Sequence, residues 1–198
     1  DYLDENNSQL GIKTILAQDK DKLEDLFKTI CHLGDDPGLI FVNFKDSIQG
    51  ISRFLSHKGI YHGVFHGGLT QKERDRALIQ FRNGSYKVLL ATDLAARGID
   101  VPEIKYILHY HLPAKIEEFS HRNGRTARMN AAGTAYLLKW VQEDLPDFIE
   151  NTEIAKIKNA PIPKAPIWKT LFLSGGRRDK ISKGDVLGFL AKKGNLAK

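Results

Sequence analysis

Residues 38–66 read GLIFVNFKDSIQGISRFLSHKGIYHGVFH and contain the pattern that decides the fold. The runs GLIFVN (38–43) and YHGVFH (61–66) are short, apolar and rich in β-branched or aromatic residues, as buried strands are. The stretch between them, DSIQGISRFLSHK (46–58), has apolar residues at helical spacing. A strand, a helix and a strand joined by short connections predict a parallel strand–helix–strand unit.

The same alternation continues on both sides of this unit. Further apolar runs predict strands at 12–17, 86–91, 104–110 and 133–138, and a helix is expected around residues 20–32. Another helix is expected over 70–84, with Thr70 as N-cap, Glu73 at the capping-box position and Gly84 as the stop. The sequence therefore predicts an α/β fold, a mainly parallel sheet with helices on both faces.

Ligands of such sheets bind at the carboxyl ends of the strands. The residues that follow the expected strands are polar, rich in glycine and partly cationic. They are Asn43-Phe44-Lys45, His66-Gly67-Gly68 and Thr92-Asp93. Thr92 offers a hydroxyl and a backbone N–H to a nucleic-acid phosphate, a contact that carries no sequence information.

The composition narrows the class of protein. With 198 residues, 41% of them hydrophobic and 27% charged, the chain has the make-up of a globular domain, and no apolar stretch approaches the roughly 20 residues that span a bilayer. Its single cysteine, Cys31, cannot form an internal disulfide, and no Cys/His cluster has zinc spacing. We therefore expect a cytoplasmic protein with no metal site of its own and no membrane partner. The acidic start, DYLDENNSQL, lacks a signal-peptide pattern and is expected to be a cut through a longer chain.

The charge is unevenly divided. Residues 160–198 hold seven lysines and two arginines against two aspartates, a net +7, so the other 159 residues carry −1 of the total of +6. Three prolines within APIPKAPIWK predict a stiff linker over 159–168. After it, a strand is expected at 170–174, then a basic loop, then a helix from about Lys183. Such a tail suits a polyanion, although a merely solvated basic extension has the same composition.

Residues 121–128 read HRNGRTAR and place arginines three residues apart. On a helix, Arg125 and Arg128 would be neighbours, and two guanidinium groups suit phosphate oxygens. The chain contains no G-x-x-x-x-G-K-[ST] loop to cradle a triphosphate. Arginines without a phosphate cradle indicate half of a split active site, whereas an exposed, solvated helix face is the plainer interpretation of the motif alone.

Three stretches together resemble motifs of the DEAD-box ATP-dependent RNA helicases. They are FHGGLTQKERDRALIQFRNG (65–84), VLLATDLAARGID (88–100) and HRNGRTAR, in the family's order and spacing, and LIFVNFK (39–45) resembles a fourth motif. The resemblance implies that residues 1–158 form the second, C-terminal RecA-like domain of a helicase core. Residues 169–198 resemble the start of the RNA-binding domain, a variant of the RRM fold, that follows the core in DbpA-type bacterial helicases.

The resemblance also implies roles for individual residues. Arg125 and Arg128 would be catalytic and reach the ATP γ-phosphate, Asp100 and Gly98 would bind ATP, and His121 and Arg122 would couple the two core domains. ATP and Mg²⁺ would be bound mainly by the first RecA-like domain, which is not part of these 198 residues. RNA would be bound by both parts of the chain, through Thr92, Arg97, Gly67, Gly68 and Lys45 in the core and Arg177, Arg178 and Lys180 in the tail.

Some positions depart from the family pattern. Phe44 stands where the family often has an RNA-contacting threonine. His111 belongs to the run YHLP (110–113), where the family usually has YDLP. Asn123 replaces an apolar residue, and Ala127 replaces a glycine, in the HRNGRTAR motif. None of these changes removes a phosphate-directed arginine.

Two rival functions remain at this point. A DNA translocase has related motifs but usually carries glutamine where this chain has His121. A binding or interaction module without chemistry would describe the chain by itself, which is expected not to hydrolyse ATP. Structured ribosomal RNA and ribosome assembly are plausible only through the resemblance of the tail.

Overall fold

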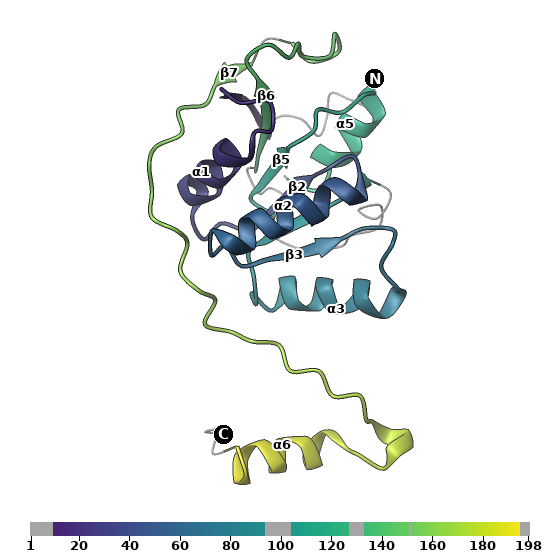
Figure 1. Ribbon diagram of the computed structural model, residues 1–198. Helices are drawn as coiled ribbons and strands as arrows, with labels where there is room; N and C mark the ends of the chain where they lie inside the picture. The colour runs from purple at the N-terminus through teal and green to yellow at the C-terminus, as the bar shows by residue number, and fades with distance from the viewer. Residues whose placement is uncertain (1–9, 94–103, 127–132, 151, 195–198) are drawn as a thin grey trace.

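The computed structural model describes residues 10–93, 104–126, 133–150 and 152–194. Within these ranges, seven parallel strands form one sheet in the order β3-β4-β2-β5-β6-β1-β7. The strands are β1 (Leu10–Ala17), β2 (Gly38–Phe41), β3 (His62–Phe65), β4 (Val88–Ala91), β5 (Tyr106–His109), β6 (Gly133–Trp140) and β7 (Glu153–Ile154). The helices are α1 (Leu23–Leu33), α2 (Lys45–His57), α3 (Gln71–Arg82), α5 (Ile116–Asn123) and α6 (Lys183–Lys192), with a single 3₁₀ turn η1 (Arg177–Asp179). The predicted parallel α/β fold is confirmed (Figure 1).

Alternate residues along each central strand pack on opposite faces of the sheet. Ile40, Leu90 and Leu108 belong to one apolar cluster, which also contains buried residues of α1 and α2. Leu39, Leu89 and Ile107, one position earlier in each strand, belong to the other cluster, which contains residues of α3. Both faces of the sheet are therefore covered, and this is why the strands read as continuous apolar runs.

The expected strands and helices of the body are present. Strands β2 to β5 are two or three residues shorter than their apolar runs, whereas β1 and β6 are two residues longer. The start and stop of α3 are those the sequence indicated, since Thr70 and Glu73 form a capping box and Gly84 has a φ of 70°. Two elements were not expected, the helix α5 and the two-residue edge strand β7. A two-residue strand such as β7 has too few residues to show a period in the sequence.

Glycine is required at one position in the centre of the sheet. Gly38 begins β2 and pairs with Tyr106 at the start of β5. A Cβ atom on residue 38 would lie 1.9 Å from the ring of Tyr106, which is buried. The tyrosine ring therefore lies over the glycine backbone, and a larger residue would have to displace it.

The prediction of a strand at 170–174 is wrong. The backbone from Lys169 to Gly176 is assigned to no strand, and Leu171 and Leu173 are 66% and 56% exposed. A strand needs a neighbour for its ladder of hydrogen bonds, and none of the described segments pairs with this one. The helix expected from Lys183 is present as α6, but none of its residues is buried.

The tail nevertheless contacts the body at two places beside α3. Thr170 Oγ1 lies 3.2 Å from Asn83 Nδ2 and 2.8 Å from Ser85 Oγ. The Arg76 guanidinium lies over the ring of Phe172, 5.2 Å from its centroid. Figure 1 shows the extended segment leaving β7, running along the side of the body and passing α3 before α6 ends the described chain. The described contacts of residues 169–194 with the body thus lie at Thr170 and Phe172, next to α3.

Candidate nucleic-acid interface at the strand ends

A cavity of about 520 Å³ opens at the carboxyl ends of β2, β3 and β4. Its described lining residues are Asn43, Lys45, Gly67, Gly68, Thr92 and Asp93. Parallel strands end at the same edge of a sheet, so residues 22 to 50 positions apart in the chain meet there. Four of the residues predicted from the sequence to bind RNA, Lys45, Gly67, Gly68 and Thr92, are thus brought together.

The positively charged side chain in the wall of this cavity is that of Lys45, at the start of a helix. Lys45 is the first residue of α2, and its N-cap, Phe44, makes no side-chain hydrogen bond to the helix end. The first N–H groups of a helix have no partner within the helix and carry partial positive charge. Lys45 and the end of α2 therefore place positive charge at one wall of the cavity, where a phosphate group would be favoured.

The glycine wall is held by a histidine. The Gly68 N–H donates to Nδ1 of His66 over 3.2 Å, and the Leu69 N–H donates to the His66 carbonyl over 3.1 Å. A Cβ on residue 68 would lie 3.1 Å from the same imidazole nitrogen. A phosphate that takes the Gly68 N–H as its donor would have to displace this imidazole contact.

Arg122 joins three strand ends behind the cavity. Its guanidinium is 1% exposed and forms a two-pronged ion pair with Asp93, with Nε to Oδ1 at 2.6 Å and Nη2 to Oδ2 at 2.5 Å. Nη2 also donates to Asn43 Oδ1 at 2.9 Å, and Nη1 donates to the His111 carbonyl at 2.9 Å and to His109 Nδ1 at 3.4 Å. These acceptors match the five N–H donors that a guanidinium has. Arg122 therefore fixes Asn43 and Asp93 in the cavity wall and neutralises the Asp93 carboxylate.

The tautomer of His109 follows from this arrangement. Arginine can only donate, so Nδ1 of His109 must accept and its proton must lie on Nε2. Nε2 lies 3.0 Å from Oδ1 of Asn123, which accepts that proton. Asn123, which departs from the apolar residue of the family motif, thus pairs with a fully buried histidine in β5. A hydrophobic residue at position 123 would leave that N–H without an acceptor.

Two histidines beside Arg122 are held neutral. Burial, and then the charge of Arg122, lower the pKa of His109 to about 3. Burial, and then the charges of Lys22 and Arg122, lower the pKa of His111 to about 4. Neither imidazole therefore adds charge to the site at neutral pH.

These shifted pKa values predict that the domain loses stability below neutral pH. Between pH 6.5 and about 3 the unfolded chain protonates His109 and the folded chain does not, so the unfolded state binds more protons and is favoured as the pH falls. The free energy of unfolding, measured with urea, is expected to be about 1.4 kcal/mol lower at pH 5.5 than at pH 7.5 because of His109. Half-buried His111 adds a smaller, solvent-screened part. His109→Gln, which cannot titrate, should reduce the difference by the part due to His109, and an unchanged difference would contradict the assignment.

A family model described as "Helicase conserved C-terminal domain" matches residues 21–130. The chain belongs to that family. Among curated relatives, it is 41% identical over 118 residues to the DEAD-box ATP-dependent RNA helicase CshB of Bacillus subtilis, an alignment that covers 60% of this chain and 26% of the relative. It is 34% identical over 149 residues to the DEAD-box ATP-dependent RNA helicase 21 of rice, covering 75% and 20%. The helicase domain thus spans about a fifth to a quarter of the length of these relatives.

Solved structures agree with this assignment. The domain matches Escherichia coli SrmB, solved bound to the regulator of ribonuclease activity A, with a TM-score of 0.68 and 27% identity, covering 79% of this chain and 97% of that one. It matches yeast Dbp5 L327V, solved bound to RNA and ADP BeF₃, with a TM-score of 0.64 and 28% identity, covering 69% and 37%. The sheet described above is therefore the C-terminal RecA-like domain of a DEAD-box RNA helicase.

The remaining predicted residues of the helicase domain are less fully placed. His121 is exposed on α5, while Arg122, its expected partner in domain coupling, directs its donors within the domain. Arg125 follows the end of α5 in a turn, its N–H donating to the Arg122 carbonyl at 3.1 Å, so no helix continues through it. Arg97, Gly98, Asp100 and Arg128 lie outside the described residues, as does Ala127. Arg177, Arg178 and Lys180 are exposed in and next to η1.

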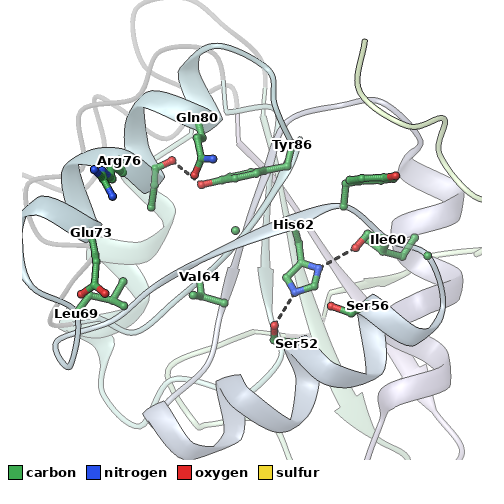
Figure 2. A pocket seen from close by; sticks show the side chains of 14 residues that line it. Ser52, Ser56, Ile60, His62, Val64, Leu69, Glu73, Arg76, Gln80 and Tyr86 are labelled. Atoms are coloured by element: carbon green, nitrogen blue, oxygen red, sulfur yellow. Dashed lines mark hydrogen bonds between the residues drawn. The ribbon is translucent and has the colours of Figure 1, made fainter. Parts of the chain in front are cut away.

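A larger cavity of the helicase domain, about 820 Å³, lies elsewhere, between α2 and α3 at the outer edge of β3. Figure 2 shows His62 at its centre, with Nε2 2.8 Å from Ser52 Oγ and Nδ1 2.8 Å from the Ile60 carbonyl. Both ring nitrogens are thus hydrogen-bonded, and none of the predicted site residues is among the described residues that line this cavity. Size alone does not identify the site.

The sequence did not reveal the buried residues that support the cavity. His109 stands inside the apolar run 104–110, and a histidine in such a run is the signal that could have indicated a buried polar contact. Its partner Asn123 was visible only as a departure from the family pattern. The described residues contain no cluster of three or more His, Cys, Asp or Glu side chains that could hold a metal ion. Every helix in the described ranges is too short or too polar to pass through a lipid bilayer.

Proposed function

We propose that this domain binds the sugar-phosphate backbone of single-stranded RNA in the cavity at the strand ends, as the second core domain of an ATP-dependent helicase. The observation that carries the proposal is the convergence of Lys45, the Gly67-Gly68 backbone and Thr92 on one cavity. A lysine, a helix N-terminus and a hydroxyl are phosphate-binding groups, and none of them reads a base edge. The yeast Dbp5 structure, solved with RNA, supports RNA as the ligand.

ATP hydrolysis needs a second domain. We propose that Arg125 and Arg128 reach the phosphates of ATP held by a first RecA-like domain, and that Asp100 and Gly98 contact the nucleotide. The coupling of the two domains falls to exposed His121, because the donors of buried Arg122 are used within this domain. Mg²⁺ would be held mainly by that first domain. The supporting evidence is the name of the curated relatives, ATP-dependent helicases, and the position of Arg125 directly after α5.

The second candidate function is an RNA-binding module without chemistry. It is favoured for the isolated chain by the missing phosphate loop. Purified alone, the 198 residues are expected to bind RNA and to show no RNA-stimulated ATP hydrolysis.

The tail extends the RNA surface. We propose that residues 169–198 begin a DbpA-type RNA-binding domain after the linker 159–168, with Arg177, Arg178 and Lys180 as phosphate contacts. Structured ribosomal RNA, with a role in ribosome assembly, is the target that the resemblance favours. The buried single cysteine suits the reducing cytoplasm as the place of action.

Lys45→Ala tests the RNA cavity. The affinity of the chain for a single-stranded RNA should fall to a similar degree for every sequence, because a phosphate contact is lost. The slope of log affinity against log salt concentration should become shallower by about 0.7, the value for one phosphate contact to a single strand. Fluorescence anisotropy with labelled oligonucleotides measures both quantities.

Lys28→Ala on α1 is the matched control. Its ammonium is largely exposed and lies 3.9 Å from Asp25, away from the strand ends. This variant should retain the wild-type salt slope. Equal slopes for wild type and Lys45→Ala would contradict the proposed cavity.

A further inference from the structure

Phe44 is an exposed aromatic residue at the mouth of the RNA cavity. It lies between Asn43 and Lys45, which line the cavity, and it is 65% exposed. Neither apolar cluster formed by the described residues includes it. The family pattern places a small polar residue here, so packing within the domain does not require a phenyl ring at this position.

Neighbouring residues hold the Phe44 ring in place. The Phe44 carbonyl accepts the Ile48 N–H at 3.3 Å, which ties its backbone to the first turn of α2. The ring meets His111 edge to face, with centroids 6.0 Å apart and planes at 63°. His111 is itself fixed, because its Nδ1 accepts the Asn43 N–H at 3.1 Å and its ring packs against Tyr110 at 5.0 Å. An exposed aromatic ring that is already ordered loses little freedom when a ligand packs on it.

The Phe44 ring and its neighbour His111 carry no charge at neutral pH, and this favours contact with an aromatic ligand over contact with an ion. His111 is neutral at pH 7, since burial and nearby cations lower its pKa to about 4. The pair Phe44 and His111 is therefore an uncharged aromatic surface directly beside a cationic one. Phe44 and Lys45 are consecutive residues, with Cα atoms about 3.8 Å apart, so one RNA strand can meet both side chains.

We propose that Phe44 is a stacking platform for one unpaired base of the RNA whose phosphate lies at Lys45 and Thr92. The inference rests on the proposed RNA-binding function and adds a base contact to a site otherwise built for the backbone. Stacking on an aromatic side chain tolerates any base but requires a base to be present and unpaired. The platform would therefore distinguish single strands from duplexes without reading sequence.

The test uses the 198-residue chain and two labelled 12-mers, one of ordinary single-stranded RNA and one with the same backbone but abasic sites. Phe44→Ala should weaken binding of the ordinary RNA about tenfold, within the range found for loss of one base–aromatic stack, and leave binding of the abasic strand unchanged. Phe44→Trp, which keeps an aromatic ring, should bind the ordinary RNA with the affinity of wild type. Tyr61→Ala removes an aromatic ring that is 58% exposed at the other cavity, and it should affect neither strand.

The outcomes separate the two proposals. If Phe44→Ala has no effect, or weakens both strands equally, the stacking platform is wrong, and an equal loss would point to a contact that does not involve a base. If Lys45→Ala also leaves binding unchanged, the RNA cavity itself is wrong. Circular dichroism of Phe44→Ala should match wild type, because the ring fills no core.

Discussion

Replacing Arg125 with alanine is expected to lower RNA-stimulated ATP hydrolysis of the full-length helicase by about 10³-fold, the lower end of the effect of an arginine finger. The reason is electrostatic: a guanidinium placed against the phosphates stabilises charge that develops during transfer. RNA affinity should stay within about twofold, because Arg125 is not among the described residues that line the RNA cavity. Steady-state ATPase assays with saturating RNA measure the first effect, and anisotropy measures the second.

The control for this prediction is Arg125→Lys, which keeps the positive charge and loses the planar fork of donors. Its turnover should lie between wild type and the alanine variant. Near-normal turnover of Arg125→Ala would show that this residue does not act on the nucleotide.

Replacing Arg122 with leucine is expected to destabilise the domain by about 3–5 kcal/mol, because a buried ion pair loses one partner. Asp93 would remain beside the core without its counter-charge, and the His111 carbonyl and His109 Nδ1 would lose a donor. Urea unfolding followed by circular dichroism measures the change in the free energy of unfolding.

Substitution of an exposed arginine is the control that separates the loss of the buried Arg122 contacts from the loss of a guanidinium as such. Arg53 on α2 is exposed, and its Nε donates to the Gln49 carbonyl one turn earlier at 3.3 Å. Arg53→Leu should change the free energy of unfolding by less than about 1 kcal/mol. If Arg122→Leu behaves like Arg53→Leu, the buried network does not support the strand ends.

The parts of the fold that could be predicted from sequence are those with a strong period. The runs at 38–42 and 88–91 are apolar throughout because both faces of the sheet are covered, and Thr70 and Glu73 mark the start of α3. The tail shows the limit of this reasoning. Residues 170–174 have the composition of a strand, but strand formation depends on a partner that composition does not reveal.

The candidate site was predictable in outline for a related reason. Once the sheet is known to be parallel, the residues that follow each strand must meet at one edge, which brought Lys45, Gly67 and Thr92 together. The contacts between side chains were not predictable, because they depend on the distances between strand ends. Arg122 was expected to face another domain, whereas its donors are used beside Asp93 and His109.

The order of the strands has a consequence for how the chain is made. β1 pairs along its whole length with β6, Leu10 with Gly133 and Ala17 with Trp140, so partners 123 residues apart must meet. A ribosome adding roughly 5–20 residues per second needs about 6–25 s to synthesise that interval. During this time β2 to β5 can pair with one another, whereas β1, which precedes them in the chain, pairs in this sheet only with the later strands β6 and β7. The backbone hydrogen-bonding groups of β1 therefore have no strand to pair with until β6, almost the last strand of the sheet, has emerged.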